Sequence, residues 1–417
     1  MKKIIYKIFI FFALFSFGIS TISFCDDIDD EIIDVNSDIL SCSTTNQSEI
    51  KEPTINSRAY VVIDRKTNMV LYGKNENQKR KMASTTKIMT ATIIIENCNL
   101  DETIEVSKKA AGTGGSRLGL KAGDKITIRD LLYGLMLRSG NDAAVALAEY
   151  VGGSIEGFAE LMNKKASELN LTNTHFETPH GLDSDEHYST AYELSLLSNY
   201  ALQNSVFAKI VNTKEHTINI NGYPKTLSNT NELLGNFEGV YGIKTGFTNG
   251  ANRCLVTACK RNDIDIICVV LGADTKKFRT QDSIKLINYI FDNFKPVNVE
   301  ELINNKFEFW KKENLDKVVI NKSLTKHLDL EVESIDNPVI LVRKDLIDSI
   351  KINIDFPLYF ESPIASNSKL GNVNASIMDY FNYDYKIYNC FEIKHKSWYF
   401  YLVDILKNYS SIFNNII

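Results

Sequence analysis

Three short strings of the sequence contain side chains that can carry out acyl transfer. They are Ser84-Thr85-Thr86-Lys87, Ser139-Gly140-Asn141 and Lys244-Thr245-Gly246. A serine hydroxyl can attack a carbonyl carbon when a nearby base, such as a neutral lysine amine, takes its proton. A lysine is neutral near pH 7 only if burial or a neighbouring cation lowers its pKa. We therefore expect Ser84 to be the nucleophile and Lys87 its base, with Lys244 as the cation.

The surroundings of Ser84 distinguish it from other serines with the same spacing to a lysine. The pattern Ser-x-x-Lys also occurs at Ser48/Lys51, Ser323/Lys326 and Ser366/Lys369. Only Ser84 precedes a long apolar run with helical spacing, which places Lys87 one turn later on the same face. Amides at the start of that helix could also stabilise an oxyanion. The alternative interpretation of Ser84 is a helix cap, because serine is a favoured capping residue.

The other two strings have structural interpretations of their own. Ser139-Gly140-Asn141 could be a polar turn between two helices, capped by Asp142, and Lys244-Thr245-Gly246 could be a strand end before a turn at Asn249-Gly250. Each string is weak alone. Their joint occurrence, each on the predicted element that the chemistry requires, favours a catalytic site.

The elements around these strings predict an α+β domain. Apolar and β-branched runs at 59–64 and 69–72 indicate a hairpin, and helices are expected over 84–97, 128–137, 142–151, 155–169 and 277–294. Strands are expected over 242–247, 252–258 and 264–271. Helices between an early hairpin and a late three-stranded meander predict one antiparallel sheet completed by both ends of the domain, with helices flanking it.

Outside the catalytic domain, the sequence predicts four further segments, two before this domain and two after it. A basic start followed by a short apolar run indicates a signal peptide at 1–24, and an acidic, flexible leader follows at 25–56. The catalytic domain spans 57–296. A small all-β domain without a catalytic cluster is expected over 297–390, from runs at 317–321, 328–333, 339–343, 350–356 and 371–388. An uncleaved anchor, or a lipid anchor on Cys25, is the alternative to signal cleavage.

The C-terminal segment 391–417 predicts an amphipathic helix. Apolar residues recur at three- and four-residue spacings from Trp398, with Trp and Tyr gathered at its start and Lys394 and Lys396 just before it. This composition is typical of a helix that lies on a membrane surface. The alternative is a terminal helix packed on the preceding domain.

Composition and cysteine count exclude several classes of protein. A formal charge of −5 and a pI near 5.8 give no electrostatic case for a nucleic-acid partner. The seven cysteines are too scattered for a disulfide framework, and no spacing suggests a metal or cofactor site. In the expected hairpin Cys254 and Cys268 fall nearly opposite each other, with Cys259 on the other face, although isolated buried thiols are the favoured interpretation.

Taken together, the three strings resemble the set that marks the penicillin-binding protein and serine β-lactamase superfamily. The closer resemblance is to the low-molecular-mass penicillin-binding proteins, the D-alanyl-D-alanine carboxypeptidases, and covers residues 59–294. It extends to further runs, namely Gly114-Gly115-Ser116, Leu120-Lys121-Ala122-Gly123-Asp124, His180-Gly181-Leu182-Asp183, Tyr188-Ser189-Thr190-Ala191 and Leu271-Gly272-Ala273.

This resemblance implies the following roles. Ser84 attacks the penultimate D-alanine of a peptidoglycan stem peptide, Lys87 is the base, and Ser139 and Asn141 relay protons and hold the substrate amide. Lys244 and Thr245 help to bind the terminal carboxylate, with Arg279 as a second contact or else a solvated charge at a helix end, and Gly246 belongs to the same substrate-binding strand. The backbone N–H groups of Ser84 and Phe247 form the oxyanion hole.

The resemblance also implies partners and a location. The partners are stem peptides ending in D-Ala-D-Ala, β-lactams as inhibitors, and the outer face of the bacterial cytoplasmic membrane, with no cofactor. Two alternatives stay open, a serine β-lactamase and a penicillin-acylated sensor without turnover. Gly140 in place of an aspartate, and the lack of a Glu-x-x-Leu-Asn segment between Ser139 and Lys244, weaken the β-lactamase alternative.

Overall fold

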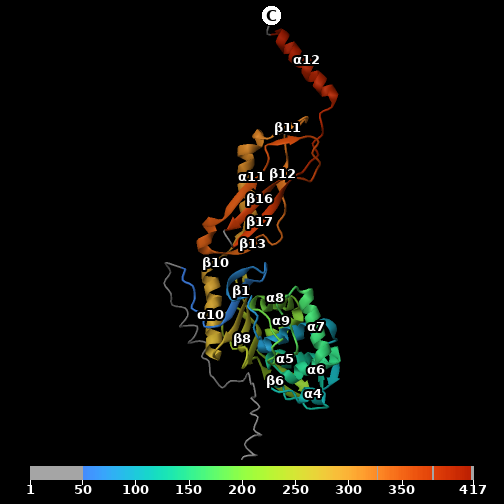
Figure 1. Ribbon diagram of the computed structural model, residues 1–417, viewed down its shortest axis with the longest axis vertical. Coiled ribbons are helices and arrows are strands. Elements are labelled where there is room, and N and C mark those ends of the chain that lie inside the picture. The colour runs from blue at the N-terminus through green and yellow to red at the C-terminus, as the bar shows by residue number, and fades with distance from the viewer. Residues whose placement is uncertain (1–49, 326, 378–379, 415–417) are drawn as a thin grey trace, which may run out of the picture. The chain divides into compact units, whose positions relative to one another are not determined.

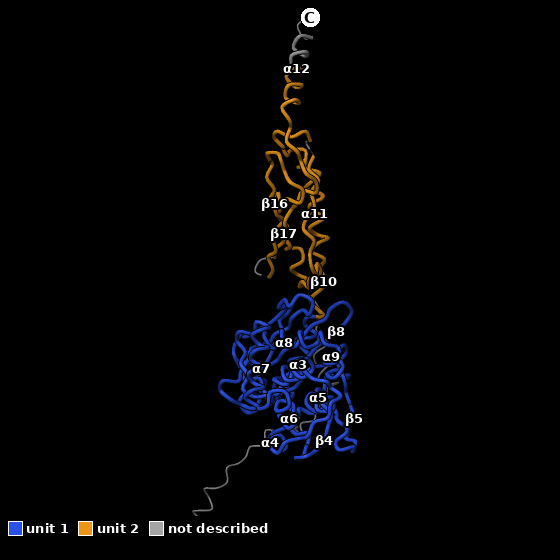
Figure 2. The backbone as a smooth tube through the Cα atoms, turned by 90° about the vertical axis from the view of Figure 1, so that its right-hand side faces the viewer, with its two compact units in different colours: residues 1–290 blue, residues 291–417 orange. Residues whose placement is uncertain are grey.

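The computed structural model describes residues 50–325, 327–377 and 380–414, so the expected signal peptide and most of the acidic leader lie outside the described residues. The chain divides into two compact units, Met1–Ile290 and Phe291–Ile417 (Figure 2). The predicted catalytic strings all belong to the first unit.

A five-stranded antiparallel sheet forms the centre of the first unit. Its strands are β1 (Ala59–Asp64), β2 (Val70–Lys74), β7 (Val240–Thr248), β8 (Asn252–Arg261) and β9 (Ile264–Ala273), in the order β2-β1-β9-β8-β7. The first and last strands of the unit thus complete one sheet, which confirms the predicted α+β arrangement. Every residue of β1 is buried, so helices must cover both faces of the sheet. Figure 1 shows α10 (Lys276–Asn293) on one side and the helices that precede β7 on the other.

The helices on that second side carry the site. They are η1 (Ala83–Thr86), α3 (Lys87–Asn97), α4 (Lys108–Ala111), α5 (Ile128–Leu137), α6 (Asn141–Gly152), α7 (Ile155–Glu168), α8 (Ala191–Leu202) and α9 (Ser205–Val211). Helix α3 is buried from its first residue to Ile94, which explains why most of its residues are apolar and why its apolar residues are not confined to one face. The predicted helices are found within a few residues of their expected bounds. Helices α8 and α9 were not predicted, and in α8 buried polar residues such as Glu193 and Asn199 interrupt the apolar pattern.

Two short antiparallel strand pairs complete the first unit. They pair β3 (Thr103–Glu105) with β4 (Lys125–Thr127), and β5 (Glu215–Ile220) with β6 (Tyr223–Ser228). The segment that follows β6 leads directly into β7, the edge strand of the central sheet.

The second unit is rich in strands, and its described residues also contain two long helices. Its largest sheet has the order β12-β17-β16-β14, formed by β12 (Leu330–Val332), β14 (Lys351–Asp355), β16 (Ser368–Ile377) and β17 (Phe381–Asn389). Two smaller pairs join β10 (Phe294–Asn298) to β13 (Val339–Arg343), and β11 (Val319–Asn321) to β15 (Tyr359–Glu361).

Helix α11 (Val299–Asn314) corrects the expectation that this unit would be purely β. Val299, Ile303 and Phe307 are its buried residues, spaced by four. A spacing of four is a helical signal, but the many charged residues between these apolar positions obscured it, so the helix was not predicted. The last helix, α12 (Trp398–Asn414), begins where the amphipathic pattern begins. None of the helices within the described ranges is both long enough and apolar enough to cross a membrane.

The β8–β9 register corrects the expected position of two cysteines. Cys268 pairs with Thr257 rather than lying near Cys254, and an irregularity between Arg253 and Leu255 shifts the pairing further. The interpretation as isolated thiols is confirmed for the five cysteines within the described residues, since none of them is in a disulfide and Cys254, Cys259 and Cys268 are buried. Burial raises the pKa of the Cys259 thiol to about 12, so that thiol is inert near neutral pH.

Candidate active site

The hydroxyl of Ser84 and the amine of Lys87 are in direct contact. Ser84 lies in η1, Lys87 is the first residue of α3, and the Nζ and Oγ atoms are 2.8 Å apart. Both residues are buried. The capping interpretation of Ser84 is wrong, because the N-cap positions of η1 and α3 are Met82 and Thr86, and neither side chain makes a capping bond.

Two carbonyl oxygens hold the Lys87 amine in place. Nζ donates to Asn141 Oδ1 at 2.7 Å and to the backbone oxygen of His180 at 2.9 Å. Carbonyl oxygens only accept hydrogen bonds, so they use two N–H groups of Lys87. The third contact of Lys87 Nζ is with Ser84 Oγ. When Lys87 is a charged ammonium, it donates a hydrogen bond to Ser84 Oγ, and when it is a neutral amine, it accepts one from the Ser84 hydroxyl. A proton can therefore pass between these two groups without either of them moving.

The turn between α5 and α6 places Ser139 and Asn141 beside this pair. Asn141 Nδ2 donates to the Gly114 carbonyl at 2.8 Å, which fixes the amide with its oxygen toward Lys87. Ser139 is fully buried with a positive φ of 59°, and within the described part of the chain its Oγ has no hydrogen-bond partner. An unpaired buried hydroxyl is costly, and a bound substrate could supply its partner.

Asp142 has a different role from the cap that was considered for it. Its buried carboxylate accepts the backbone N–H groups of Leu118, Gly119 and Leu120, at 2.7 to 3.0 Å. Asp142 thus fastens the loop before α5 to the first turn of α6, next to Asn141. These bonds help to fix the position of the neighbouring Asn141.

Strand β7 approaches the nucleophile with its backbone. A Cβ built on Gly246 would lie 3.1 Å from the Ser84 backbone nitrogen and 3.2 Å from Ala83 Cβ, so only glycine allows this separation without a shift. Lys244 is buried, and its Nζ donates to the Thr245 carbonyl at 2.9 Å. The side chain of Phe247 lies against the Arg253 guanidinium, 3.7 Å from ring centroid to Cζ. The third string is therefore next to the first, although 160 residues separate Ser84 from Lys244 in the sequence.

A buried histidine that sequence reasoning missed supports η1. His187 Nδ1 accepts the Glu177 N–H at 2.9 Å, so the neutral ring carries its hydrogen on Nε2 and donates it to Thr86 Oγ1 at 2.8 Å. Thr86 in turn donates to the Ala83 carbonyl. Burial, assisted by the His175 charge, lowers the pKa of His187 to about 4, which keeps the ring neutral. A lone histidine carries no sequence signal for this role, since only the fold brings it to Thr86.

The loop from His180 to Asp183 closes the site on a second side. Burial and the Lys87 charge lower the pKa of His180 to about 3, and its backbone oxygen is the acceptor described above. Asp183 accepts the Thr248 hydroxyl at 2.6 Å and the Gly250 N–H at 2.8 Å, which ties this loop to the end of β7. The resemblance named this run, but no role for it followed from the sequence.

Arg279 is not the solvated charge that was the alternative for it. It is 3% exposed and forms an ion pair with Glu232. Burial alone would raise the pKa of the Glu232 carboxyl, but the Arg279 charge and the Thr280 hydroxyl bring it below its ordinary value.

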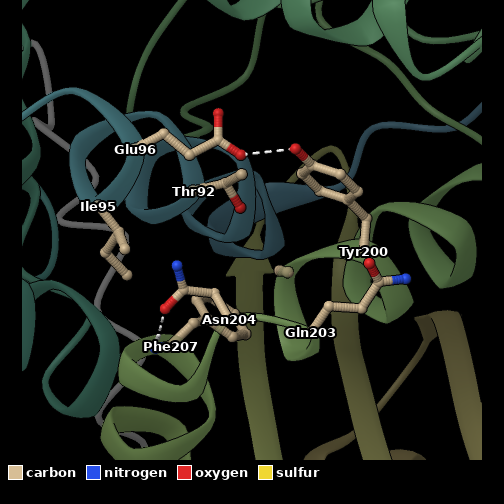
Figure 3. A pocket seen from close by; sticks show the side chains of 8 residues that line it. Thr92, Ile95, Glu96, Tyr200, Gln203, Asn204 and Phe207 are labelled. Atoms are coloured by element: carbon tan, nitrogen blue, oxygen red, sulfur yellow. Dashed lines mark hydrogen bonds between the residues drawn. The ribbon is translucent and has the colours of Figure 1, made fainter.

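A separate cavity of about 210 Å³ lies between α3, α8 and α9 (Figure 3). It is lined by the C-terminal half of α3, including Glu96, and by Tyr200 and Asn204. The Tyr200 hydroxyl donates to Glu96 at 2.7 Å and Asn204 caps α9, so these polar groups are already paired within the protein. None of the predicted catalytic residues lines this cavity.

The antiparallel sheet and the Ser84–Lys87–Asn141 contacts beside β7 define the class of penicillin-recognising serine proteins. Comparison with known proteins specifies the family. The family model described as D-alanyl-D-alanine carboxypeptidase matches residues 46–275, more than half of the chain, and the chain belongs to that family. The resemblance seen in the sequence is thus confirmed.

Individual relatives agree with this assignment. The chain is 38% identical over 245 residues to the D-alanyl-D-alanine carboxypeptidase DacF of Bacillus subtilis, covering 57% of this chain and 63% of the relative. It thus matches slightly less than two thirds of that relative's length. The crystal structure of the D-alanyl-D-alanine carboxypeptidase DacD from Francisella tularensis has a TM-score of 0.66 at 26% identity, covering 84% of this chain and 98% of that one. For the Streptomyces K15 DD-transpeptidase the TM-score is 0.56 at 36% identity, covering 58% and 99%.

Proposed function

We propose that this protein is a serine D-Ala-D-Ala carboxypeptidase that removes the terminal D-alanine from peptidoglycan stem peptides. The observation that carries the proposal is the Lys87 amine, which contacts Ser84 Oγ and Asn141 Oδ1 at the same time. The contact gives the nucleophile a base and connects the first two strings. Membership of the family supports the same activity.

Acylation begins when Ser84 Oγ attacks the carbonyl carbon of the penultimate D-alanine and its proton passes to Lys87. The tetrahedral oxyanion is stabilised by the backbone N–H groups of Ser84 and Phe247, for which the close approach of Gly246 to Ser84 N is the structural support. The C–N bond then breaks, and the leaving amine of the terminal D-alanine takes, through Ser139, the proton that Lys87 received from Ser84. The product is an ester on Ser84.

Deacylation repeats these steps with water as the nucleophile. Lys87 takes a proton from the water, the ester C–O bond breaks, and Ser84 regains its hydrogen. A β-lactam acylates Ser84 by opening its ring, and the leaving amine stays attached to the acyl group. It therefore continues to occupy the side from which water would approach, which accounts for β-lactams as inhibitors.

The carboxylate of the terminal D-alanine is held by Lys244, Thr245 and Arg279. Lys244 is a buried cation, Arg279 is a buried cation that also pairs with Glu232, and the Thr245 hydroxyl can donate a hydrogen bond. Buried cations bind an anionic group more strongly than exposed ones, because water does not screen them. This explains why the enzyme would select a free C-terminus.

The purified protein is expected to release D-alanine from diacetyl-L-Lys-D-Ala-D-Ala and to form a penicillin adduct that decays slowly. Free D-alanine is measured with a D-amino-acid oxidase assay, and the adduct by intact mass over time. Stable penicillin labelling without D-alanine release would favour the sensor. Rapid hydrolysis of nitrocefin would favour the β-lactamase.

We also propose that α12 attaches the exported protein to the outer face of the cytoplasmic membrane. Trp398 is 76% exposed and Leu406 60% exposed. A helix with large exposed apolar side chains and with aromatic residues in its first turn is suited to the interface of a bilayer.

Removal of residues 398–417 is expected to move the protein from the membrane fraction to the soluble fraction. This truncation is preferable to one from residue 391, because Ile393 is buried and exchanges backbone hydrogen bonds with Ile364. Phe309→Ser, at an exposed aromatic on α11, is the matched control and should leave the protein on membranes. Unchanged membrane association of the truncated protein would exclude α12 as the anchor.

A further inference from the structure

Residues 229–232, the first part of the segment between β6 and β7, contact two groups of the proposed carboxylate site. The Thr230 hydroxyl lies 2.7 Å from the Thr245 hydroxyl. Two residues later, Glu232 pairs with Arg279 and accepts the Thr280 hydroxyl. Sequence reasoning assigned no role to any residue of this segment.

One backbone and one side-chain hydrogen bond fix the same segment to α5 and to β7. The Thr230 N–H donates to the carbonyl of Leu137, the last residue of α5, at 3.1 Å. Asn231 Nδ2 donates to the Gly242 carbonyl in β7, also at 3.1 Å. Thr230 is therefore held between the end of α5, two residues before Ser139, and the strand that carries Lys244 and Thr245.

The direction of the hydrogen bond between the two threonines follows from the charge of the substrate. A hydroxyl has a single hydrogen, and a carboxylate can only accept. When Thr245 donates its hydrogen to the carboxylate, its oxygen remains free to accept one from Thr230. A donor bonded to the Thr245 oxygen also polarises the Thr245 hydroxyl, which makes it a better donor itself.

We propose that Thr230 is a positioning residue that orients the Thr245 hydroxyl toward the carboxylate of the substrate, and so determines the preference for a free C-terminus. The inference rests on the proposed carboxypeptidase function. Thr230 does not touch the scissile bond and acts through Thr245. Its loss should weaken recognition of the carboxylate and leave the chemistry at Ser84 intact.

The test compares diacetyl-L-Lys-D-Ala-D-Ala with the same peptide ending in a C-terminal amide. In Thr230→Val, which keeps the shape and loses the hydroxyl, KM for the acid is expected to rise about tenfold with kcat within about twofold, since hydrogen bonds to charged groups contribute on that scale. The ratio of kcat/KM for acid over amide should fall by the same factor. Thr230→Ser keeps the hydroxyl and should restore the ratio.

Thr217→Val is the matched control. Thr217 and Thr226 form a similar pair of hydroxyls, 3.0 Å apart, on the exposed β5–β6 hairpin. An unchanged acid-to-amide ratio in Thr230→Val, an equal loss on both peptides, or the same fall in Thr217→Val would overturn the inference. If the unmodified protein released no D-alanine, the proposed function itself would be wrong. If the unmodified protein released D-alanine normally but Thr230→Val left the acid-to-amide ratio unchanged, only the inference about Thr230 would be wrong.

Discussion

Replacement of Ser84 by alanine is expected to abolish covalent labelling by penicillin and to lower D-alanine release by at least about 10⁴-fold. The structure gives the reason, because Ser84 Oγ is the hydroxyl in contact with the buried Lys87 amine. Removal of the oxygen removes the atom that forms the acyl ester. The backbone N–H of residue 84 and the approach of Gly246 remain, so non-covalent binding should survive. Labelling is measured by intact mass after incubation with benzylpenicillin.

Ser366→Ala is the matched control for this experiment. Ser366 shares the Ser-x-x-Lys spacing through Lys369, but it is exposed in the second unit and no helix follows it. This variant should label and turn over like the unmodified protein. A penicillin adduct on a folded Ser84→Ala protein would show that another residue is the nucleophile, and the whole assignment would then be wrong.

The contrast between these two serines shows how much the sequence could predict. The spacing of serine and lysine was uninformative until the apolar run after Ser84 was taken into account. That run is a sound predictor because α3 is buried from Lys87 to Ile94, and buried positions favour apolar residues. The same reasoning found the strands β1, β8 and β9, which are buried along most of their length.

Other parts of the site were beyond sequence reasoning for a physical reason. The Lys87 amine is held by a backbone carbonyl of His180, and any residue type has such a carbonyl. Thr230 and His187 act through hydrogen bonds to Thr245 and Thr86, and those partners become neighbours only when the chain folds. The site was predictable where side-chain chemistry and helical spacing define it. The parts of the site that are defined by backbone groups and by long-range contacts were not predictable.

The second large effect is expected from Gly181→Ala, which should destabilise the first unit by about 2 to 5 kcal/mol and lower D-alanine release about 100-fold. Gly181 has a positive φ of 86°, and a Cβ there would lie 2.5 Å from Thr86 Oγ1 and closer still to the Ala83 carbonyl oxygen. A backbone oxygen cannot rotate away from the new atom, so η1 or the loop must shift. Ser84 lies within η1, and a shift of about 1 Å would spoil its alignment with Lys87.

The matched control separates this steric effect from backbone strain. Gly222, in the turn between β5 and β6, has a φ of 83° and nothing within 4 Å of a built Cβ. Gly222→Ala carries only the cost of a left-handed conformation, about 1 to 2 kcal/mol, and should keep its activity. Thermal unfolding and kcat/KM are measured for both variants at a temperature where each is folded. Activity of folded Gly181→Ala within about threefold of the unmodified protein would mean that the contact of Gly181 with η1 does not hold the nucleophile in place.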